Sequence, residues 1–225
     1  MDTRLQLHWA AQAAAGVGRT LLPCQDDDSH TNFAWSDERG ALMQGDGRSG
    51  LRLRDLTLLY GDEEFPLAGR TLDDAFRFFE ERTGTSLKRP GEATPPEHAV
   101  SCGAVFTPDF AQLERLAQLY AQAHRELSRI HQPVRCWPHH FDIATLISLG
   151  GGRTIGVGLS PGDGQYPEPY WYVTPYPYPA ERVSKPLPAG FWNTEGWYGA
   201  VLPASSDANV AEFLDAAIAA VSPVG

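Results

Sequence analysis

The sequence has few cysteines, few basic residues and no long apolar run. Its three cysteines, Cys24, Cys102 and Cys136, are far apart and odd in number, which excludes a disulfide framework and a Cys-x-x-Cys metal site. Lys and Arg total 18 against 28 Asp and Glu, so the formal net charge is -10, and the basic residues are spread thinly. Because binding to a phosphate backbone needs clustered cations, we do not expect nucleic acid as a partner.

The hydropathy of the sequence indicates the cellular location that we expect for the protein. No stretch reaches the ~18 to 20 uninterrupted apolar residues that span a bilayer. The first residues also lack a basic segment followed by an apolar run and a cleavage site. We therefore expect a cytoplasmic protein that binds no membrane. With 225 residues, the chain is long enough for one domain with its own hydrophobic core.

Periodicity in the sequence predicts the secondary structure. Apolar residues at spacings of three and four predict helices over residues 3–15, 71–84, 107–131 and 207–221. Alternating or short apolar runs predict strands over residues 31–35, 41–44, 51–60, 134–149, 154–160, 170–176 and 197–202. Within residues 51–60 the alternation changes parity near Arg54, which indicates a bulge.

The order of these elements predicts the fold class. Strands follow one another through short loops rather than alternating strictly with helices. This order favours a single α+β domain over residues 1–225, with a mainly antiparallel sheet and helices packed against it. Residues 85–104 are rich in Pro, Gly and charge, and we expect them to form a surface loop.

Residues 136–142, CWPHHFD, carry the densest group of chemically active side chains. His139, His140 and Asp142 lie within four residues, at the start of an apolar stretch. If the backbone is extended here, His140 and Asp142 point to one face of the sheet and His139 points to the other.

The hairpin that follows adds a further acid to this group. Residues 150–152 are glycines and predict a tight loop. We consider the antiparallel register in which the numbers of two directly opposed residues sum to 303. In this register His140 faces Asp163 and Asp142 faces Pro161. The sequence thus predicts a cluster of His140, Asp142 and Asp163, which a slip of one residue would break.

This cluster has three interpretations. His140, Asp142 and Asp163 can bind a divalent cation such as Zn²⁺, Mn²⁺ or Fe²⁺. His140, Asp142 and Glu168, an acid that stands between two prolines, can instead perform general acid/base chemistry in a metal-free pocket for a small molecule. Alternatively, these side chains only cap a strand end and satisfy buried backbone groups.

Aromatic residues are concentrated in one stretch. Ten of the 24 aromatic residues lie within residues 166–198, interleaved with prolines. Such a stretch can form a wall that stacks on sugars, nucleobases or other flat ligands, or it can pack on the protein's own sheet. We expect Tyr170 and Trp171, together with Trp137, to contact a ligand, and the tyrosines of residues 176–178 to pack on the sheet.

Residues 158–162, GLSPG, match the G-x-S-x-G pattern of a nucleophile elbow. That elbow requires a helix directly after the serine and a catalytic histidine later in the chain. Residues 161–164, PGDG, do not start a helix, and the last histidine, His140, precedes Ser160. The order of the residues excludes an α/β-hydrolase, and Ser160 is interpreted as a turn residue.

The C-terminal part of the chain resembles uncharacterised bacterial proteins. The shared motifs are residues 137–142 (WPHHFD), 160–163 (SPGD), 167–170 (PEPY), 192–193 (WN) and 199–200 (GA). A fainter similarity to a larger bacterial domain family rests on residues 7–9 (LHW), 32–35 (NFAW) and 141–142 (FD). The resemblance implies no activity. It implies that His140, Asp142, Asp163 and Glu168 form one recurring set, whereas His139 departs from the pattern.

Two hypotheses for function follow. The first is an enzyme in which His140 is a base or metal ligand, Asp142 and Asp163 orient it or bind metal, and Glu168 is a second acid or base. The alternative is a noncatalytic module that binds a small ligand or another partner, in which the aromatic stretch provides the contact surface and the polar cluster is structural.

Overall fold

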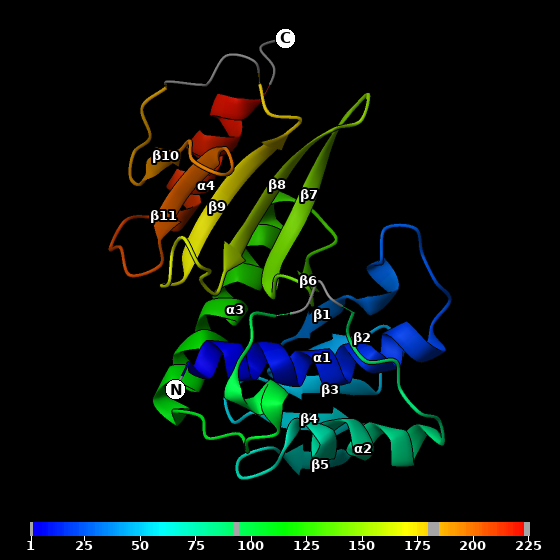
Figure 1. Cartoon of the computed structure of the whole chain (residues 1–225). Helices are drawn as coiled ribbons and strands as arrows, with labels where there is room; N and C mark the ends of the chain where they lie inside the picture. Colours follow the sequence, from blue (N-terminus) through cyan, green and yellow to red (C-terminus); the bar gives the residue numbers. More distant parts are fainter. Residues whose placement is uncertain (1, 92–94, 180–184, 223–225) are drawn as a thin grey trace. The chain divides into compact units, whose positions relative to one another are not determined.

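The computed structural model describes residues 2–91, 95–179 and 185–222 and contains two compact units (Figure 1). Unit 1 comprises Met1–Ala121 and Arg135–Phe141, and unit 2 comprises Gln122–Val134 and Asp142–Gly225. Both units combine an antiparallel sheet with helices, so the predicted antiparallel α+β class is confirmed. The assignment of residues 1–225 to one domain stays a prediction.

Unit 1 is a meander of antiparallel strands with helices on one face. Its helices are α1 (Thr3–Leu21), α2 (Leu72–Thr83) and the first part of α3 (Phe110–Ile130). Its strands are β1 (Phe33–Ser36), β2 (Ala41–Gln44), β3 (Ser49–Arg52), β4 (Thr57–Tyr60), β5 (Glu63–Pro66) and β6 (Arg135–Trp137). They pair in the order β6-β1-β2-β3-β4-β5. Short 3₁₀ turns occur at Ser29–Thr31 and Ala99–Cys102.

A row of leucines forms the centre of unit 1. Leu42, Leu51 and Leu58 are direct cross-strand partners and are fully buried. Phe76 and Phe79 of α2 are also fully buried, and α1 and α2 pack on each other and on β2, β3 and β4. Burial of this apolar area is the main stabilising contribution to the unit.

Helix α1 is longer than predicted. It continues through Gly16 and Gly18 to Leu21 instead of ending near residue 15. A Cβ on Gly18 would lie 2.4 Å from the carbonyl oxygen of His30, so this glycine allows a close approach of backbone rather than ending the helix. Helix α2 begins with a capping box, in which Thr71 and Asp74 exchange side-chain and backbone hydrogen bonds.

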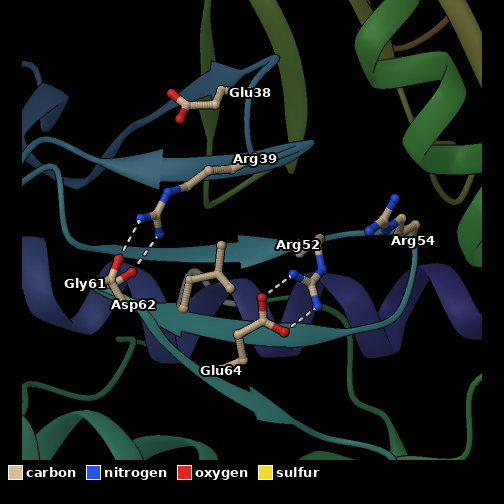
Figure 2. A pocket seen from close by; sticks show the side chains of 8 residues that line it. Glu38, Arg39, Arg52, Arg54, Gly61, Asp62 and Glu64 are labelled. Atoms are coloured by element: carbon tan, nitrogen blue, oxygen red, sulfur yellow. Dashed lines mark hydrogen bonds and ion pairs between the residues drawn. The ribbon is translucent and has the colours of Figure 1, made fainter.

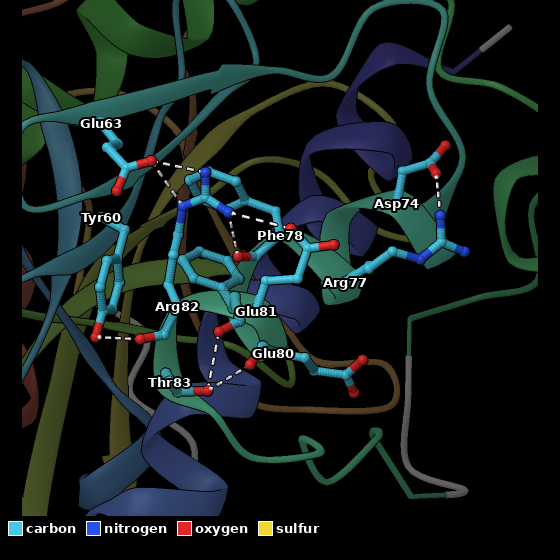
Figure 3. Close-up of polar contacts among 10 residues, drawn as sticks. Tyr60, Glu63, Asp74, Arg77, Phe78, Glu80, Glu81, Arg82 and Thr83 are labelled. Carbon is cyan, nitrogen blue, oxygen red and sulfur yellow. Dashed lines mark hydrogen bonds and ion pairs between the residues drawn. The ribbon is translucent and has the colours of Figure 1, made fainter.

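Arg82 connects α2 to the edge strand β5 (Figure 3). Its guanidinium binds the carboxylate of Glu63 at 2.7 Å and lies 3.8 Å from the ring centroid of Phe78. Phe65 of β5 stacks on Phe78 with centroids 4.8 Å apart. These contacts cover one side of a short, charged edge strand, and such features oppose edge-to-edge association.

The bulge predicted near Arg54 is instead a hairpin turn between β3 and β4.

Unit 2 contains five antiparallel strands. Its strands are β7 (Asp142–Gly150), β8 (Arg153–Ser160), β9 (Tyr170–Tyr176), β10 (Phe191–Asn193) and β11 (Gly199–Pro203), paired in the order β10-β11-β9-β8-β7. Helix α4 (Val210–Val221) packs against β8, β9 and β11. The cross-strand row of Ile143, Leu159, Trp171 and Leu202 lies on the helix-covered face and is buried.

The predicted register of the β7–β8 hairpin is wrong by one residue along most of its length. Next to the loop, Gly150 pairs with Arg153, as a sum of 303 requires. A bulge between Ser148 and Gly150 then shifts the register, and Ile143 pairs with Leu159, a sum of 302. Asp142 therefore aligns with Ser160 rather than with Pro161. One extra residue in one strand is enough to cause this change.

No helix in the three described segments of the chain is both long and apolar enough to cross a membrane.

The pairing of β8 with β9 places Gly158 opposite Tyr172. A Cβ on Gly158 would lie 2.7 Å from the Tyr172 hydroxyl oxygen and 2.8 Å from the carbonyl oxygen of Ile143. We expect Gly158→Ala to lower the free energy of unfolding by about 1 to 3 kcal/mol, because the added methyl group displaces packed atoms. Chemical denaturation measures this change.

Gly164→Ala is the matched control. Nothing lies within 4 Å of a Cβ at Gly164, and its φ is not in the left-handed region. This variant should unfold at the wild-type midpoint or slightly above it. Equal midpoints for the two variants would contradict the packing of Tyr172 over Gly158.

Candidate functional site

The motif at residues 136–142 forms a turn, which corrects the predicted continuous strand over residues 134–149. β6 ends at Trp137 and β7 begins at Asp142. Between them, the Phe141 N–H donates to the carbonyl oxygen of Trp137 at 2.6 Å, and Phe141 has a φ of 58°. The backbone around His140 is therefore not extended, and alternation does not place His140 on the same face as Asp142.

Helix α1 holds this turn. The Pro138 carbonyl oxygen accepts hydrogen bonds from His8 Nε2 at 2.8 Å and from Gln12 Nε2 at 2.5 Å. The Phe141 ring stacks on the His8 ring with centroids 5.3 Å apart, and the Tyr120 hydroxyl donates to the Phe141 carbonyl oxygen. Pro138 and Phe141 thus have structural roles. These contacts also connect residues 7–9 with residues 141–142, two of the segments on which the fainter resemblance rests.

The two histidines of the motif lie at the tip of the turn. His139 and His140 are exposed, with ring centroids 4.6 Å apart, and Trp137 lies 5.8 Å from His139. All three belong to unit 1, whereas Asp142, Asp163 and Glu168 belong to unit 2. The residues of the predicted cluster of His140 with two or three carboxylates are therefore divided between the two units, and the cluster stays a prediction.

Within unit 2, the structure places Asp142 and Asp163 beside two tyrosines of β9. The Tyr172 hydroxyl donates to Asp142 Oδ2, and the Tyr170 hydroxyl donates to Asp163 Oδ2 at 2.6 Å. Asp163 Oδ1 also accepts from the backbone N–H groups of Gln165 at 2.7 Å and Tyr166 at 2.8 Å. Each carboxylate thus fixes one aromatic side chain.

The strand register explains how the tyrosine side chains reach these acids. Ser160 of β8 pairs with Tyr170, and Gly158 pairs with Tyr172. Because Gly158 has no side chain, the Tyr172 ring lies across β8 and its hydroxyl reaches Asp142 on β7. Tyr170 and Tyr172 have the same parity, so both point away from the buried row that contains Trp171.

Five aromatic side chains form a continuous group on this face, which we call the aromatic cluster: Tyr166, Tyr170, Tyr172, Phe191 and Trp197. Ring centroids of neighbouring members lie between 5.2 Å, for Tyr166 and Tyr170, and 6.4 Å, for Tyr172 and Trp197. Tyr170 is only 6% exposed, whereas Phe191 is 43% exposed and the other three are half-buried. The cluster therefore presents ring surface to solvent on a packed base.

Asn193 holds the outer part of the aromatic cluster. Its side-chain oxygen accepts from the Tyr166 hydroxyl at 2.9 Å, and its side-chain nitrogen donates to the Trp197 carbonyl oxygen at 2.6 Å. At the centre of the cluster, burial raises the pKa of Tyr170, and donation to Asp163 raises it further. Tyr170 consequently stays neutral and keeps donating at physiological pH.

The other residues predicted to bind ligand lie elsewhere. Trp171 is 1% exposed and lies in the buried row under helix α4, on the face opposite to Tyr170. Trp137 belongs to unit 1. Glu168 is exposed in the loop before β9. Of the three residues predicted to contact ligand, Tyr170 alone belongs to the aromatic cluster.

Metal binding has no preformed site in the described parts of the chain. Residues 2–91, 95–179 and 185–222 contain no group of three or more His, Cys, Asp or Glu side chains arranged to hold a metal ion.

Unit 1 contains a polar pocket that the sequence did not indicate (Figure 2). Its volume is about 310 Å³, and its lining includes Arg39, Arg52, Arg54 and Glu64. Arg52 binds both carboxylate oxygens of Glu64, at 2.5 and 2.7 Å, and its Nε donates to Asp55 at 3.0 Å. The donors of this guanidinium are engaged by the protein's own acids. The pairing of Arg52 with Glu64 depends on the β3–β4–β5 register, which sequence patterns did not resolve.

A second pocket in unit 1, of about 490 Å³, lies between α1 and α2. It is lined by Trp9, Leu72, Phe76 and Arg89, among others. Arg89 lies 3.7 Å from the Phe76 ring centroid and binds Asp73 at 3.1 Å. As with Arg52 in the first pocket, the guanidinium of Arg89 already binds an acidic side chain of the protein.

Comparison with known proteins gave no match: no family model, no curated protein and no solved structure is similar to this chain at a significant level. The resemblance to bacterial proteins therefore stays a prediction.

The buried His8 makes the turn sensitive to pH. Burial lowers the pKa of His8 to about 4 from its ordinary value of 6.5, although the hydrogen bond to Pro138 opposes this shift. Below pH 6.5 the unfolded chain binds a proton at His8 that the folded chain excludes. The contribution of His8 to the free energy of unfolding is therefore complete above pH 6.5. About 3 kcal/mol of this free energy is lost as the pH falls from 6.5 towards 4. Urea denaturation at a series of pH values measures this loss.

His131 provides the control for this experiment, because it is an exposed histidine that lies outside the turn. His131→Gln should keep the wild-type dependence of stability on pH. His8→Gln, whose amide can still donate to Pro138, should flatten it. Equal pH profiles for the two variants would show that His8 is not the group responsible.

Proposed function

We propose that this protein is a noncatalytic binding module for a small ligand, and that the ligand contacts the aromatic cluster of unit 2. The observation that carries the proposal is the cluster itself, in which three tyrosine hydroxyls are held by Asp142, Asp163 and Asn193. Aromatic side chains that are partly exposed and fixed in orientation suit the recognition of a ligand by contact with their faces.

Preorganisation supports this proposal. Ordering a free side chain on binding costs roughly 0.5 to 1.5 kcal/mol, and a side chain that is already fixed avoids most of that cost. Tyr166, Tyr170 and Tyr172 are each held by a hydrogen bond at the far end of the ring. Tyr170 and Trp197 also stack with an angle of 24° between their planes.

The same contacts give the carboxylates a structural explanation. Asp142 and Asp163 each accept from a tyrosine, and Asp163 also fixes the backbone of residues 165–166. These structural roles of Asp142 and Asp163 favour the noncatalytic alternative.

Trp197→Ala tests this proposal directly. We expect at least one of three probes, glucose, adenosine and choline, to bind the wild-type chain in saturation-transfer NMR. Loss of the Trp197 ring should weaken that binding by about tenfold or more, equivalent to about 1.4 kcal/mol, because a large aromatic contact is removed.

Trp192→Ala is the matched control. Trp192 precedes Asn193 on β10 and stacks on Tyr198, so it lies outside the aromatic cluster, although it is also half-buried. This variant should bind like the wild type. The proposal fails if none of the three probes binds, or if the two variants lose affinity equally.

A further inference from the structure

We propose that the ligand of the aromatic cluster is a small organic cation, a quaternary ammonium or an alkylated amine. This inference rests on the proposed function and specifies its ligand class. Three observations support it. They are the angle between the Trp197 and Tyr172 rings, the sign of the charge around the aromatic cluster, and the hydrogen bonds that the polar groups of the cluster already make.

The first observation is the arrangement of Trp197 and Tyr172. Their planes meet at 81° with centroids 6.4 Å apart, so the two half-buried rings form the walls of a corner. Tyr170 lies beside both, 6.3 Å from each ring centroid. A cation within about 6 Å of a ring centroid is attracted by the negative face of the ring, and tryptophan gives the strongest attraction.

The second observation is the sign of the surrounding charge. The described residues of this segment, 160–179 and 185–200, contain three acids, Asp163, Glu168 and Glu195, and one basic residue, Lys185. The Glu195 carbonyl oxygen accepts from Asn193 Nδ2 at 3.1 Å, which places that residue beside the cluster. Asp142 adds a carboxylate from β7. An anionic ligand would be repelled at this surface, whereas a cation would be attracted.

Hydrogen bonding strengthens this preference. A phenol that donates to a carboxylate becomes more electron-rich, because the negative acceptor polarises the O–H bond and the ring attached to it. Tyr170 and Tyr172 both donate to aspartates. The faces of these two rings are consequently more attractive to a cation than those of tyrosines bonded to water.

The third observation separates a cation from a sugar. The three hydroxyl donors of the cluster and the Asn193 amide already have partners within unit 2. A polyhydroxylated ligand needs directional donors and acceptors, and these are committed here. A quaternary ammonium needs none, because its attraction to ring faces and carboxylates has no strict direction.

A comparison of charged and neutral isosteres tests the inference. Choline and 3,3-dimethyl-1-butanol have nearly the same shape, but only choline carries a positive charge. We expect the wild-type full chain to bind choline and tetramethylammonium, and to bind the neutral alcohol at least tenfold more weakly, as measured by saturation-transfer NMR titration. Choline affinity should be lower for Trp197→Phe and unchanged for Trp192→Phe.

The outcomes distinguish the two proposals. Equal affinities for choline and its neutral isostere would overturn the inference, as would Trp197-dependent binding of glucose or adenosine without binding of either cation. In both cases the proposed binding function would stand. If neither cation nor any of the neutral probes binds, both proposals fall. Because the isostere comparison uses the wild-type protein, it does not depend on how the variants fold.

Discussion

The aromatic cluster depends on the absence of a side chain at Gly158. The space above this residue lets the Tyr172 side chain lie across β8, so a residue of β9 forms a hydrogen bond with Asp142 of β7. Neighbouring strands lie about 4.8 Å apart, and this contact therefore spans two strand spacings. A side chain at position 158 would fill that space, and the corner formed by Tyr172 and Trp197 would lose one of its walls.

Local signals in the sequence predicted much of the fold. The capping box of α2 is encoded within four residues, Thr71 to Asp74, and needs no distant partner to form. The extent of α1 could not be predicted in this way, because Gly16 and Gly18 end a helix in most contexts. Here Gly18 instead faces the backbone of His30, a contact that only the folded unit creates.

The candidate site shows the same division between local and tertiary information. Alternation along β9 predicts that Tyr170 and Tyr172 share a face, and this follows from sequence alone. The bulge beside Gly150 could not be located, because three consecutive glycines fit several hairpin registers equally well. The turn at Pro138 could not be predicted from the sequence either. The side chains that hold it, His8 and Gln12, lie more than 120 residues earlier in the chain.

The path of the chain between the two units limits how they can be divided. Residues 122–134 belong to unit 2, yet they are followed by Arg135–Phe141, which return to unit 1 and contribute β6. Helix α3 itself passes from one unit to the other without interruption. No single break in the polypeptide therefore yields two intact pieces: a fragment that ends at residue 121 lacks β6, and one that begins at residue 142 lacks the end of α3.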